Sequence, residues 1–198
     1  MPGRRYSKYD GFTPFRIEPT SFPNLEVIME FYDVIEARRS IRGYLDKNVP
    51  DEAIARISRA VQLAPTACNR QPFRLFLFRD AAMRAKICEK VAFFPWLKEA
   101  PVVAVLAGNA SAAWERPDGG SIVDVDASIV MEHFVLAATA EGLGTCWICC
   151  YDRAQVDAAA GIAAPWRSVA VSPLGFGREN ACRPRNVKPV DELVQVIG

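Results

Sequence analysis

Three arginines and a serine lie within five positions of the sequence, between Arg38 and Arg42. Arg38, Ser40 and Arg42 alternate, so an extended segment would place all three side chains on one face, and a helical turn would still bring Arg38 and Arg42 together. Guanidinium groups bind phosphate oxygens through two parallel hydrogen bonds, and a serine hydroxyl adds a further donor. The cluster therefore suits a phosphomonoester. The alternative is a solvated helix end, with arginines near the negative pole of the helix dipole.

A second group of candidate binding residues lies in the loop APTACNRQP, residues 64–72. Small residues let the backbone approach a flat ligand, and Asn69 and Gln71 each offer a donor and an acceptor, which match the imide edge of a heterocycle or the hydroxyls of a sugar alcohol. A loop that only ends a helix and begins a strand would have a similar composition. The sequence contains no P-loop motif and no G-x-G-x-x-G turn after a strand, so side chains would have to hold any nucleotide.

Cys146, Cys149 and Cys150 form a C-x-x-C motif with a third thiol beside it. A redox C-x-x-C needs a helix N-terminus to lower a thiol pKa, and a zinc site needs two more well-spaced ligands. The motif lies in a predicted strand with neither context, so we interpret these thiols as structural and expect no metal site. A thiol-dependent or zinc-binding protein stays open as an alternative.

The composition indicates one folded domain with little net charge. The chain has 198 residues, of which 51% are hydrophobic, and 24 Lys and Arg balance 23 Asp and Glu to a net charge of +1. This balance gives no general electrostatic reason to expect a nucleic-acid or anionic-membrane partner. Because we find no apolar export signal and no apolar stretch of about 20 residues, we expect a cytoplasmic protein with reduced thiols.

Hydrophobic periodicity predicts the helices and strands that must position these groups. Residues 1–23 show no sustained period and are expected to form an irregular arm before a domain of residues 24–198. Helical spacing predicts helices over residues 25–35, 50–64, 81–92 and 124–141. Apolar density predicts strands over residues 74–80, 102–109, 145–151 and 168–177, and residues 189–198 are expected to form a helix or a strand. Because helices and strands mix without a regular βαβ rhythm, we expect an α+β fold.

Five short segments, in order along the chain, resemble the FMN-dependent nitroreductase family. They are residues 38–44, 64–73, 99–103, 137–147 and 188–193, which read RRSIRGY, APTACNRQPF, EAPVV, AATAEGLGTCW and KPVDEL. The resemblance runs from about residue 26 to the end of the chain. It implies an α+β fold with a central, mostly antiparallel sheet flanked by helices, in a homodimer whose subunits exchange their C-terminal segments.

The resemblance also implies that FMN lies at the subunit interface, held by three parts of the chain. The residues expected to bind the phosphate and the pyrimidine side of the flavin are Arg38, Arg39, Ser40 and Arg42. The loop expected to come from the partner subunit contributes Pro65, Thr66, Ala67, Asn69 and Gln71. The segment expected to run along the ring system and to offer a backbone N–H to flavin N5 contains Ile148, Cys149 and Cys150.

One position departs from the family pattern at the expected phosphate site. Relatives usually carry a basic residue two positions before the proline of Lys188-Pro189, whereas this chain has Val187 there. Arg185 is the expected replacement, with Arg183 and Lys188 as alternatives.

The implied reaction carries hydride from NADH or NADPH through flavin N5 to a small organic acceptor, such as a nitroaromatic or a quinone, by a ping-pong mechanism. Because FMN supplies the chemistry, no catalytic side chain is expected beyond Arg42, which would stabilise negative charge at the N1/O2 edge. One alternative is a flavoenzyme of the same fold with a specialised reaction, namely reductive dehalogenation, azoline oxidation or flavin cleavage. Another is a flavin-binding protein without catalysis.

Overall fold

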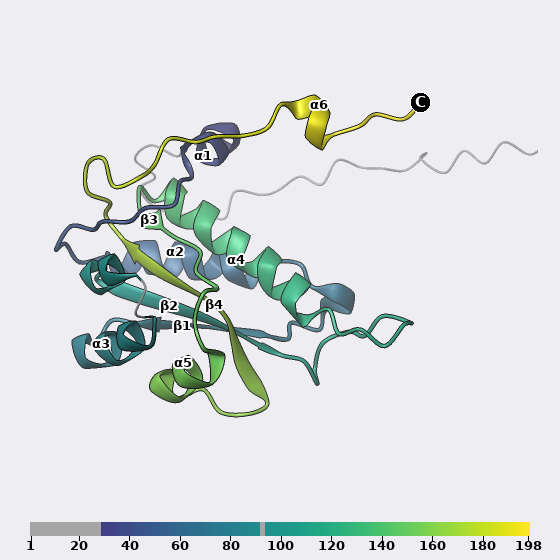
Figure 1. Ribbon diagram of the computed structural model, residues 1–198, viewed down its shortest axis with the longest axis horizontal. Coiled ribbons are helices and arrows are strands. Elements are labelled where there is room, and N and C mark those ends of the chain that lie inside the picture. The colour runs from purple at the N-terminus through teal and green to yellow at the C-terminus, as the bar shows by residue number, and fades with distance from the viewer. Residues whose placement is uncertain (1–28, 92–93) are drawn as a thin grey trace, which may run out of the picture.

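The computed structural model describes residues 29–91 and 94–198, which form four strands, six α-helices and two short 3-10 helices (Figure 1). The strands are β1 (Phe73–Phe78), β2 (Val102–Asn109), β3 (Gly144–Thr145) and β4 (Trp166–Gly175). The α-helices are α1 (Phe31–Ala37), α2 (Asp51–Gln62), α3 (Ala81–Lys90), α4 (Val123–Ala140), α5 (Arg153–Ala160) and α6 (Val190–Leu193). The 3-10 helices are η1 (Ala67–Asn69) and η2 (Pro95–Glu99).

The strands form one antiparallel sheet in the order β1-β2-β4-β3. Strand β2 lies inside the sheet, and its residues from Val102 to Gly108 are buried, because both faces of the sheet are covered. Successive side chains of a strand point to opposite faces. Accordingly, Leu106 packs in one hydrophobic core and Val105 in the other. This sheet confirms the predicted α+β fold with an antiparallel sheet.

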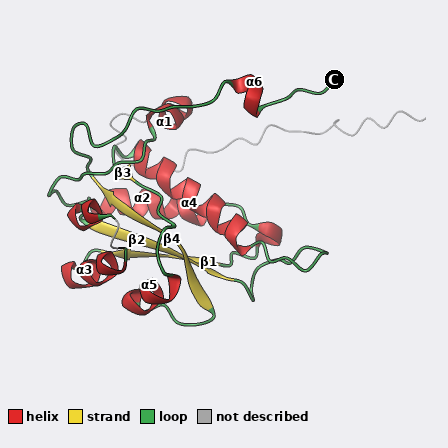
Figure 2. Ribbon diagram, viewed as in Figure 1, coloured by secondary structure: helices red, strands yellow, loops and turns green. Residues whose placement is uncertain are grey.

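Helices cover both faces of the sheet (Figure 2). Helices α2 and α4 supply the first core, where Ile57 and Phe134 are fully buried, and α3 and α5 supply the second, which contains Ile87 and Val156. The predicted helix of residues 124–141 is confirmed as α4, and Gly142 follows its end with a left-handed φ of 69°. That conformation suits glycine, and it lets Leu143 N–H donate to Ala138 O at 2.8 Å.

The strand predicted over residues 145–151 is wrong beyond Thr145. Ile148 still exchanges two hydrogen bonds of 2.9 Å with Val171 in β4, but the chain turns where Tyr151 N–H donates to Cys149 O. The side chain of Asp152 then caps helix α5 by accepting from Gln155 N–H. The local turn and cap therefore outweigh the strand preference of the apolar run. The sequence reasoning missed α5, although an N-capping aspartate marks its start.

Two predictions concern residues near the termini. The arm of residues 1–23 and the first part of the helix predicted over residues 25–35 lie outside the described residues, and α1 begins at Phe31. The segment predicted as helix or strand near the C-terminus contains the single-turn helix α6 and then continues without regular structure. Across residues 29–91 and 94–198, every helix is too short or too polar to cross a lipid bilayer.

Candidate functional site

The arginine cluster forms an extended segment rather than a helical turn. Ile41 N–H donates to Thr145 O at 2.8 Å, which attaches the segment to the end of β3, and Arg42 N–H donates to Ala181 O at 2.8 Å. Ser40 and Thr145 form a parallel bridge, and Ile41 pairs with Cys182. The segment is therefore held on both sides by backbone hydrogen bonds. Of the two geometries considered from the sequence, the extended one is observed.

Arg38, Ser40 and Arg42 all lie close to one buried thiol, that of Cys146. Burial raises the pKa of Cys146, and this rise is opposed first by Arg42, then by a hydrogen bond with Ser40, and last by Arg38. Because the segment is extended, the alternating side chains of Arg38, Ser40 and Arg42 lie on one side of it, as the sequence predicts, and Cys146 lies near them. The three are half-buried, so their donors are partly shielded from water.

Arg39 differs from the other arginines in its surroundings. It donates a hydrogen bond to Arg183 O and lines a cavity of about 340 Å³, together with Ile41, Gly144 and Arg178. Alternation along an extended segment explains why residues 39 and 41 share this cavity. The structure thus divides the predicted group between two sides of one segment.

Arg185 lies against the start of the arginine cluster. Its guanidinium donates to Arg38 O and, at 3.5 Å, to Ile35 O, two carbonyl groups at the C-terminal end of α1. A cation at this end is favoured by the helix dipole, although α1 is short. The structure therefore brings Arg185, the expected replacement for the missing basic residue, close to the cluster.

Tyr44 and Glu99 position the arginine segment, and the sequence reasoning gave them no role beyond membership of the resembling segments. Tyr44 is buried, its hydroxyl donates to Ile41 O at 2.8 Å, and its N–H donates to Glu99 Oε2 at 3.0 Å. Burial raises the pKa of Tyr44 well above its usual value. Glu99 also accepts from Arg178 at 2.6 Å. These bonds fix the end of the segment at Arg42.

The loop of residues 64–72 is compact and bonded within itself. Gln71 N–H donates to Thr66 Oγ1 at 2.9 Å, and Gln71 Nε2 donates to Asn69 Oδ1 at 3.0 Å. Cys68, Asn69 and Gln71 have left-handed φ values of 51°, 52° and 50°. This conformation is uncommon for residues with a side chain, so the surrounding structure must hold the loop in place.

Asp126 connects this loop to helix α4 and was missed from the sequence. Its carboxylate Oδ1 accepts from Ala67 N–H at 2.9 Å, although the two residues are 59 positions apart. Asp126 lies in the first turn of α4 and is 1% exposed. An aspartate in a predicted helix gives no signal of such a partner, because the contact depends on how the loop folds over the helix.

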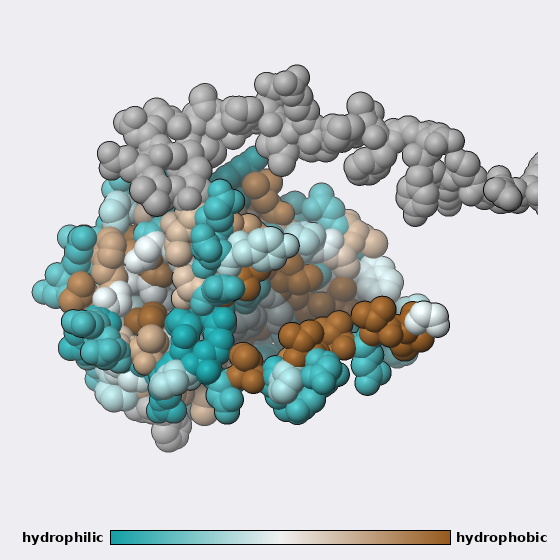
Figure 3. Space-filling view, turned by 90° about the horizontal axis from the view of Figure 1, so that it is seen from above, coloured by the Kyte–Doolittle hydropathy of each residue, from teal (hydrophilic) through white to brown (hydrophobic). Residues whose placement is uncertain are grey.

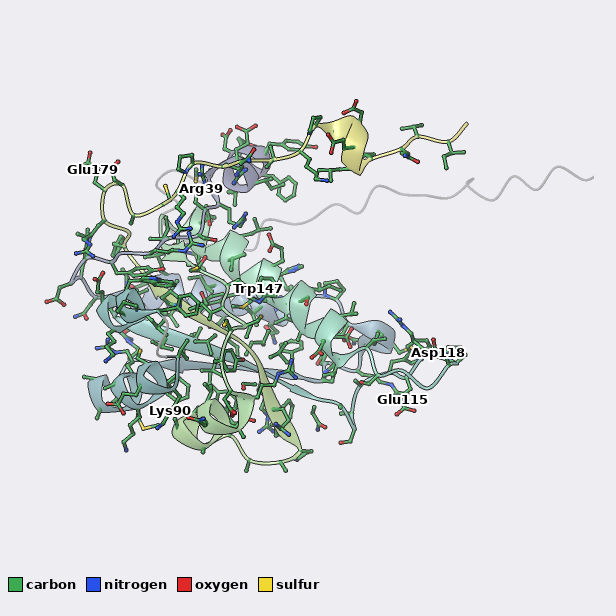
Figure 4. The ribbon with its side chains drawn as sticks, viewed as in Figure 1. Arg39, Lys90, Glu115, Asp118, Trp147 and Glu179 are labelled. Carbon is green, nitrogen blue, oxygen red and sulfur yellow. The ribbon has the colours of Figure 1, made fainter. Side chains whose placement is uncertain are left out.

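The two predicted binding groups lie at opposite ends of α4. The loop contacts Asp126 in the first turn, whereas the arginine segment contacts Thr145 beyond the last turn. With a rise of 1.5 Å per residue, the helical residues between them span on the order of 20 Å. Figure 4 shows the two ends of α4: Arg39 lies near the end where α1 and β3 meet, and Glu115 and Asp118 lie on the hairpin before its start. Within one chain, the arginine segment and the loop of residues 64–72 therefore do not lie at the same end of a small ligand.

The segment after β3 runs along β4 from the arginine end toward the middle of the sheet. Thr145 lies opposite Leu174 and Ile148 lies opposite Val171. The N–H of Ile148 is used by that pairing, whereas none of the hydrogen bonds of the described residues uses the N–H of Cys149 or Cys150. Both residues are exposed.

The thiols of the C-x-x-C motif lie in different surroundings. Cys146 is buried and Cys149 is exposed, and the Trp147 indole N–H donates to Cys149 Sγ at 3.1 Å. All six cysteines are free thiols. Within residues 29–91 and 94–198, His, Cys, Asp and Glu side chains do not gather in threes at a distance suited to a metal ion.

Comparison with known proteins identifies relatives for most of the chain. The model of the Nitroreductase family matches residues 35–93 and 89–176. A protein of Methanothermobacter thermautotrophicus, provisionally named NADH dehydrogenase/NAD(P)H nitroreductase, is 32% identical over 156 residues, which cover 77% of this chain and 80% of that protein. The FMN reductase [NAD(P)H] of Bacillus subtilis is 32% identical over 134 residues, which cover 61% of this chain and 52% of that protein.

A solved structure shares the fold. The crystal structure of a nitroreductase family protein from Clostridium novyi NT superposes with a TM-score of 0.73 and 28% identity, and the match covers 79% of this chain and 89% of that one. The ranges matched by the family model contain the arginine segment, the loop of residues 64–72 and the segment after β3. The chain belongs to the nitroreductase family.

Proposed function

We propose that this protein is an FMN-dependent oxidoreductase that takes electrons from NADH or NADPH and reduces a small organic acceptor, such as a nitroaromatic or a quinone. Membership of the nitroreductase family supports the reaction class, and the names of the relatives support both the flavin and the nicotinamide donor. The observation that carries the proposal is the extended segment that gathers Arg38, Ser40 and Arg42 on one side.

The residues present fit a phosphorylated flavin. Arg38, Ser40 and Arg42 supply charged and neutral donors for a phosphate and for the electron-rich edge of the ring system, and their partial burial strengthens such hydrogen bonds. In this assignment Arg42 stabilises negative charge at the N1/O2 edge. Arg185 adds positive charge at the same end of the site, since it donates to Arg38 O.

The segment after β3 would face the ring system. Because Ile148 uses its N–H in the pairing with Val171, we assign the hydrogen bond to flavin N5 to the N–H of Cys149 or Cys150. A backbone donor does not depend on the side chain, so the two cysteines are compatible with this role. FMN, when bound, supplies the hydride chemistry, and the chain orients the ring and the acceptor beside it.

The separation of the two binding groups supports a site built by two chains. We propose that the loop of residues 65–71 acts on the cofactor held by the arginine segment of the partner subunit. Its Pro65, Thr66, Ala67, Asn69 and Gln71 would then be cofactor-binding residues of a homodimer. Within one chain, α4 keeps the arginine segment and the loop on the order of 20 Å apart. In a dimer, the loop of one chain can lie beside the arginine segment of the other.

The C-terminal segment supports exchange between the subunits of this dimer. It extends away from the body of the protein, and Figure 3 shows hydrophobic side chains along it. Val196 and Ile197 are 94% and 90% exposed. Strand β1 is an edge strand, and a groove of about 340 Å³ beside it is lined by residues including Leu75 and Leu77. An apolar segment and a sheet edge beside a groove that contains leucine side chains are complementary surfaces.

The function is tested on the purified protein. We expect bound flavin in the visible spectrum, bleaching by NADH or NADPH under anaerobic conditions, and recovery of the colour when a nitroaromatic or a quinone is added. Light scattering after size exclusion should give twice the mass of the chain. A colourless monomer that does not bind added FMN would refute the proposal. A yellow protein that neither nucleotide bleaches would favour a flavin-binding protein without this activity.

The role of the arginine cluster is tested by Arg38→Ala. Losing a charged hydrogen bond costs about 1.5 to 3 kcal/mol, so we expect FMN to bind at least about tenfold more weakly. Arg59→Ala is the matched control, because Arg59 is exposed on α2 and bonds only to Gln62 among the described residues. The Kd for FMN, measured by flavin fluorescence quenching, checks both variants. Equal affinities would count against the assignment of the cluster.

A further inference from the structure

Asp126 is a buried carboxylate whose two oxygens have unequal partners. It is 1% exposed, and its Oδ1 accepts from Ala67 N–H at 2.9 Å. Its Oδ2 is also buried, and no donor in the described part of the chain reaches it. A buried polar atom without a partner costs free energy. The first turn of α4 reduces this cost, because the positive end of the helix dipole favours an acidic group there.

Asp157 is a second buried aspartate, and both of its carboxylate oxygens accept hydrogen bonds. It is 6% exposed, its Oδ1 accepts from Ser168 N–H at 2.8 Å, and its Oδ2 accepts from Arg167 at 3.0 Å. Asp157 thus joins α5 to β4 with both oxygens satisfied. Asp126 has no such second partner among the described residues.

The hydrogen bond of Asp126 ends on a loop that needs support. Cys68, Asn69 and Gln71 all have left-handed backbone conformations, which are unfavourable for residues with side chains. The bonds of Gln71 to Thr66 and Asn69 lie within the loop of residues 65–71, so its hydrogen bonds to the body of the protein are those of Ala67 to Asp126 and of Arg70 to Ala113 O, the latter at 2.9 Å. A charged acceptor for Ala67 N–H makes a stronger hydrogen bond than a neutral one would.

We infer that Asp126 is a positioning residue that holds the loop of residues 65–71 in its cofactor-binding conformation. The inference rests on the proposed function, because the loop is assigned there to the cofactor of the partner subunit. When only a fraction of the molecules has the binding conformation, the apparent Kd rises by the inverse of that fraction. Removing the charged acceptor should lower the fraction and weaken FMN binding, although Asp126 does not touch the cofactor.

The test compares Asp126→Asn with Asp157→Asn in the full chain. Each variant replaces one buried aspartate that accepts a backbone N–H, but only Asp126 contacts the loop. We expect the Kd for FMN to rise at least fivefold in Asp126→Asn and less than twofold in Asp157→Asn. In the flavin-free proteins, amide hydrogen exchange of residues 65–71 should become faster only in Asp126→Asn. Asp126→Ala, which also removes the orphan oxygen, should reproduce both effects.

Several results would overturn the inference. Equal Kd values for Asp126→Asn and Asp157→Asn would do so, as would unchanged hydrogen exchange in the loop. Unfolding of both Asp126 variants where Asp157→Asn folds would also overturn it, because Asp126 would then hold the fold rather than the loop. If the unmodified protein binds no FMN, the proposed function fails. Hydrogen exchange in the flavin-free chain still shows whether Asp126 orders the loop.

Discussion

Gly144 is a position where a single methyl group should disturb the arginine segment. A Cβ atom added to Gly144 would lie 2.7 Å from Ile41 Cγ1, 2.9 Å from Ile41 Cβ and 3.0 Å from Ile41 Cγ2. Rotation of the Ile41 side chain does not relieve the second contact, because Cβ moves only with the backbone. The backbone of Ile41 is fixed in turn by its hydrogen bond to Thr145 O. Gly144→Ala therefore forces the segment away from β3.

The expected cost follows from these contacts. Overpacking of this kind destabilises a protein by about 1 to 3 kcal/mol, and weakening of the bond between Ile41 and Thr145 adds up to about 1 kcal/mol. For a chain of this length, 1 kcal/mol lowers the melting temperature by about 2 to 4 °C. The total loss of about 1 to 4 kcal/mol in Gly144→Ala should therefore lower it by roughly 2 to 16 °C. FMN should also bind more weakly, because Ser40 and Arg42 flank the displaced residue.

The assay is a double-mutant cycle with Ile41→Ala, which removes two of the three close atoms. Thermal and urea unfolding, followed by circular dichroism, give the stability of the two single variants and of the double variant. The double variant should lose about 1 kcal/mol less than the sum of the single losses, since coupling between residues in contact reaches such values. Gly120→Ala is the control, because its added Cβ would come no closer than 3.4 Å to a neighbour.

Two results would refute this reasoning. One is a melting temperature of Gly144→Ala that matches that of Gly120→Ala. The other is strict additivity in the cycle, which would mean that Ile41 does not resist the added methyl group. Either result would show that the arginine segment yields without cost and is not held by β3.

Two further predictions concern titrating groups. Burial raises the pKa of Tyr151 from 10.0 to about 12, so its stabilising contribution is present below pH 10 and is lost as the pH rises toward 12. This loss of folding free energy amounts to roughly 2 to 3 kcal/mol, and Tyr151→Phe should remove most of it. Urea midpoints that are equal in Tyr151→Phe and the unmodified protein from pH 10 to 12 would contradict the prediction. Burial also raises the pKa of Cys88 and of Cys146, so both should react slowly with a thiol reagent in the native protein. In the flavin-free protein, mass spectrometry should find more rapid labelling at the exposed thiols, and fast labelling of Cys88 would contradict the structure. The exposed thiols are Cys68, Cys149, Cys150 and Cys182.

The long, regular elements could be predicted from the sequence because their signal is local. Helices α2 and α4 and strands β2 and β4 were expected close to their observed bounds, since each buries a repeating apolar face. The same periodicity failed over residues 145–151. There, an apolar run meets an N-capping aspartate, and the chain leaves the sheet edge after one further bridge to Val171.

The candidate site divides in the same way. The alternation of Arg38, Ser40 and Arg42 predicted a shared face, because the side chains of an extended segment alternate whatever lies around it. The sequence could not reveal that Asp126 binds Ala67 or that Tyr44 binds Ile41. Asp126 and Ala67 are far apart in the sequence, and only the folded chain brings them together. The bond of Tyr44 to Ile41 depends on a turn that tertiary contacts fix.

By itself, the sequence determined the kind of chemistry available to this protein: cationic and neutral donors for a phosphate, and small polar residues for a flat ring. These properties belong to residue types and to short spacings. Only the tertiary structure decided where the groups lie. Helix α4 keeps the arginine segment and the loop of residues 65–71 on the order of 20 Å apart in one chain, because a helix rises by a fixed 1.5 Å per residue.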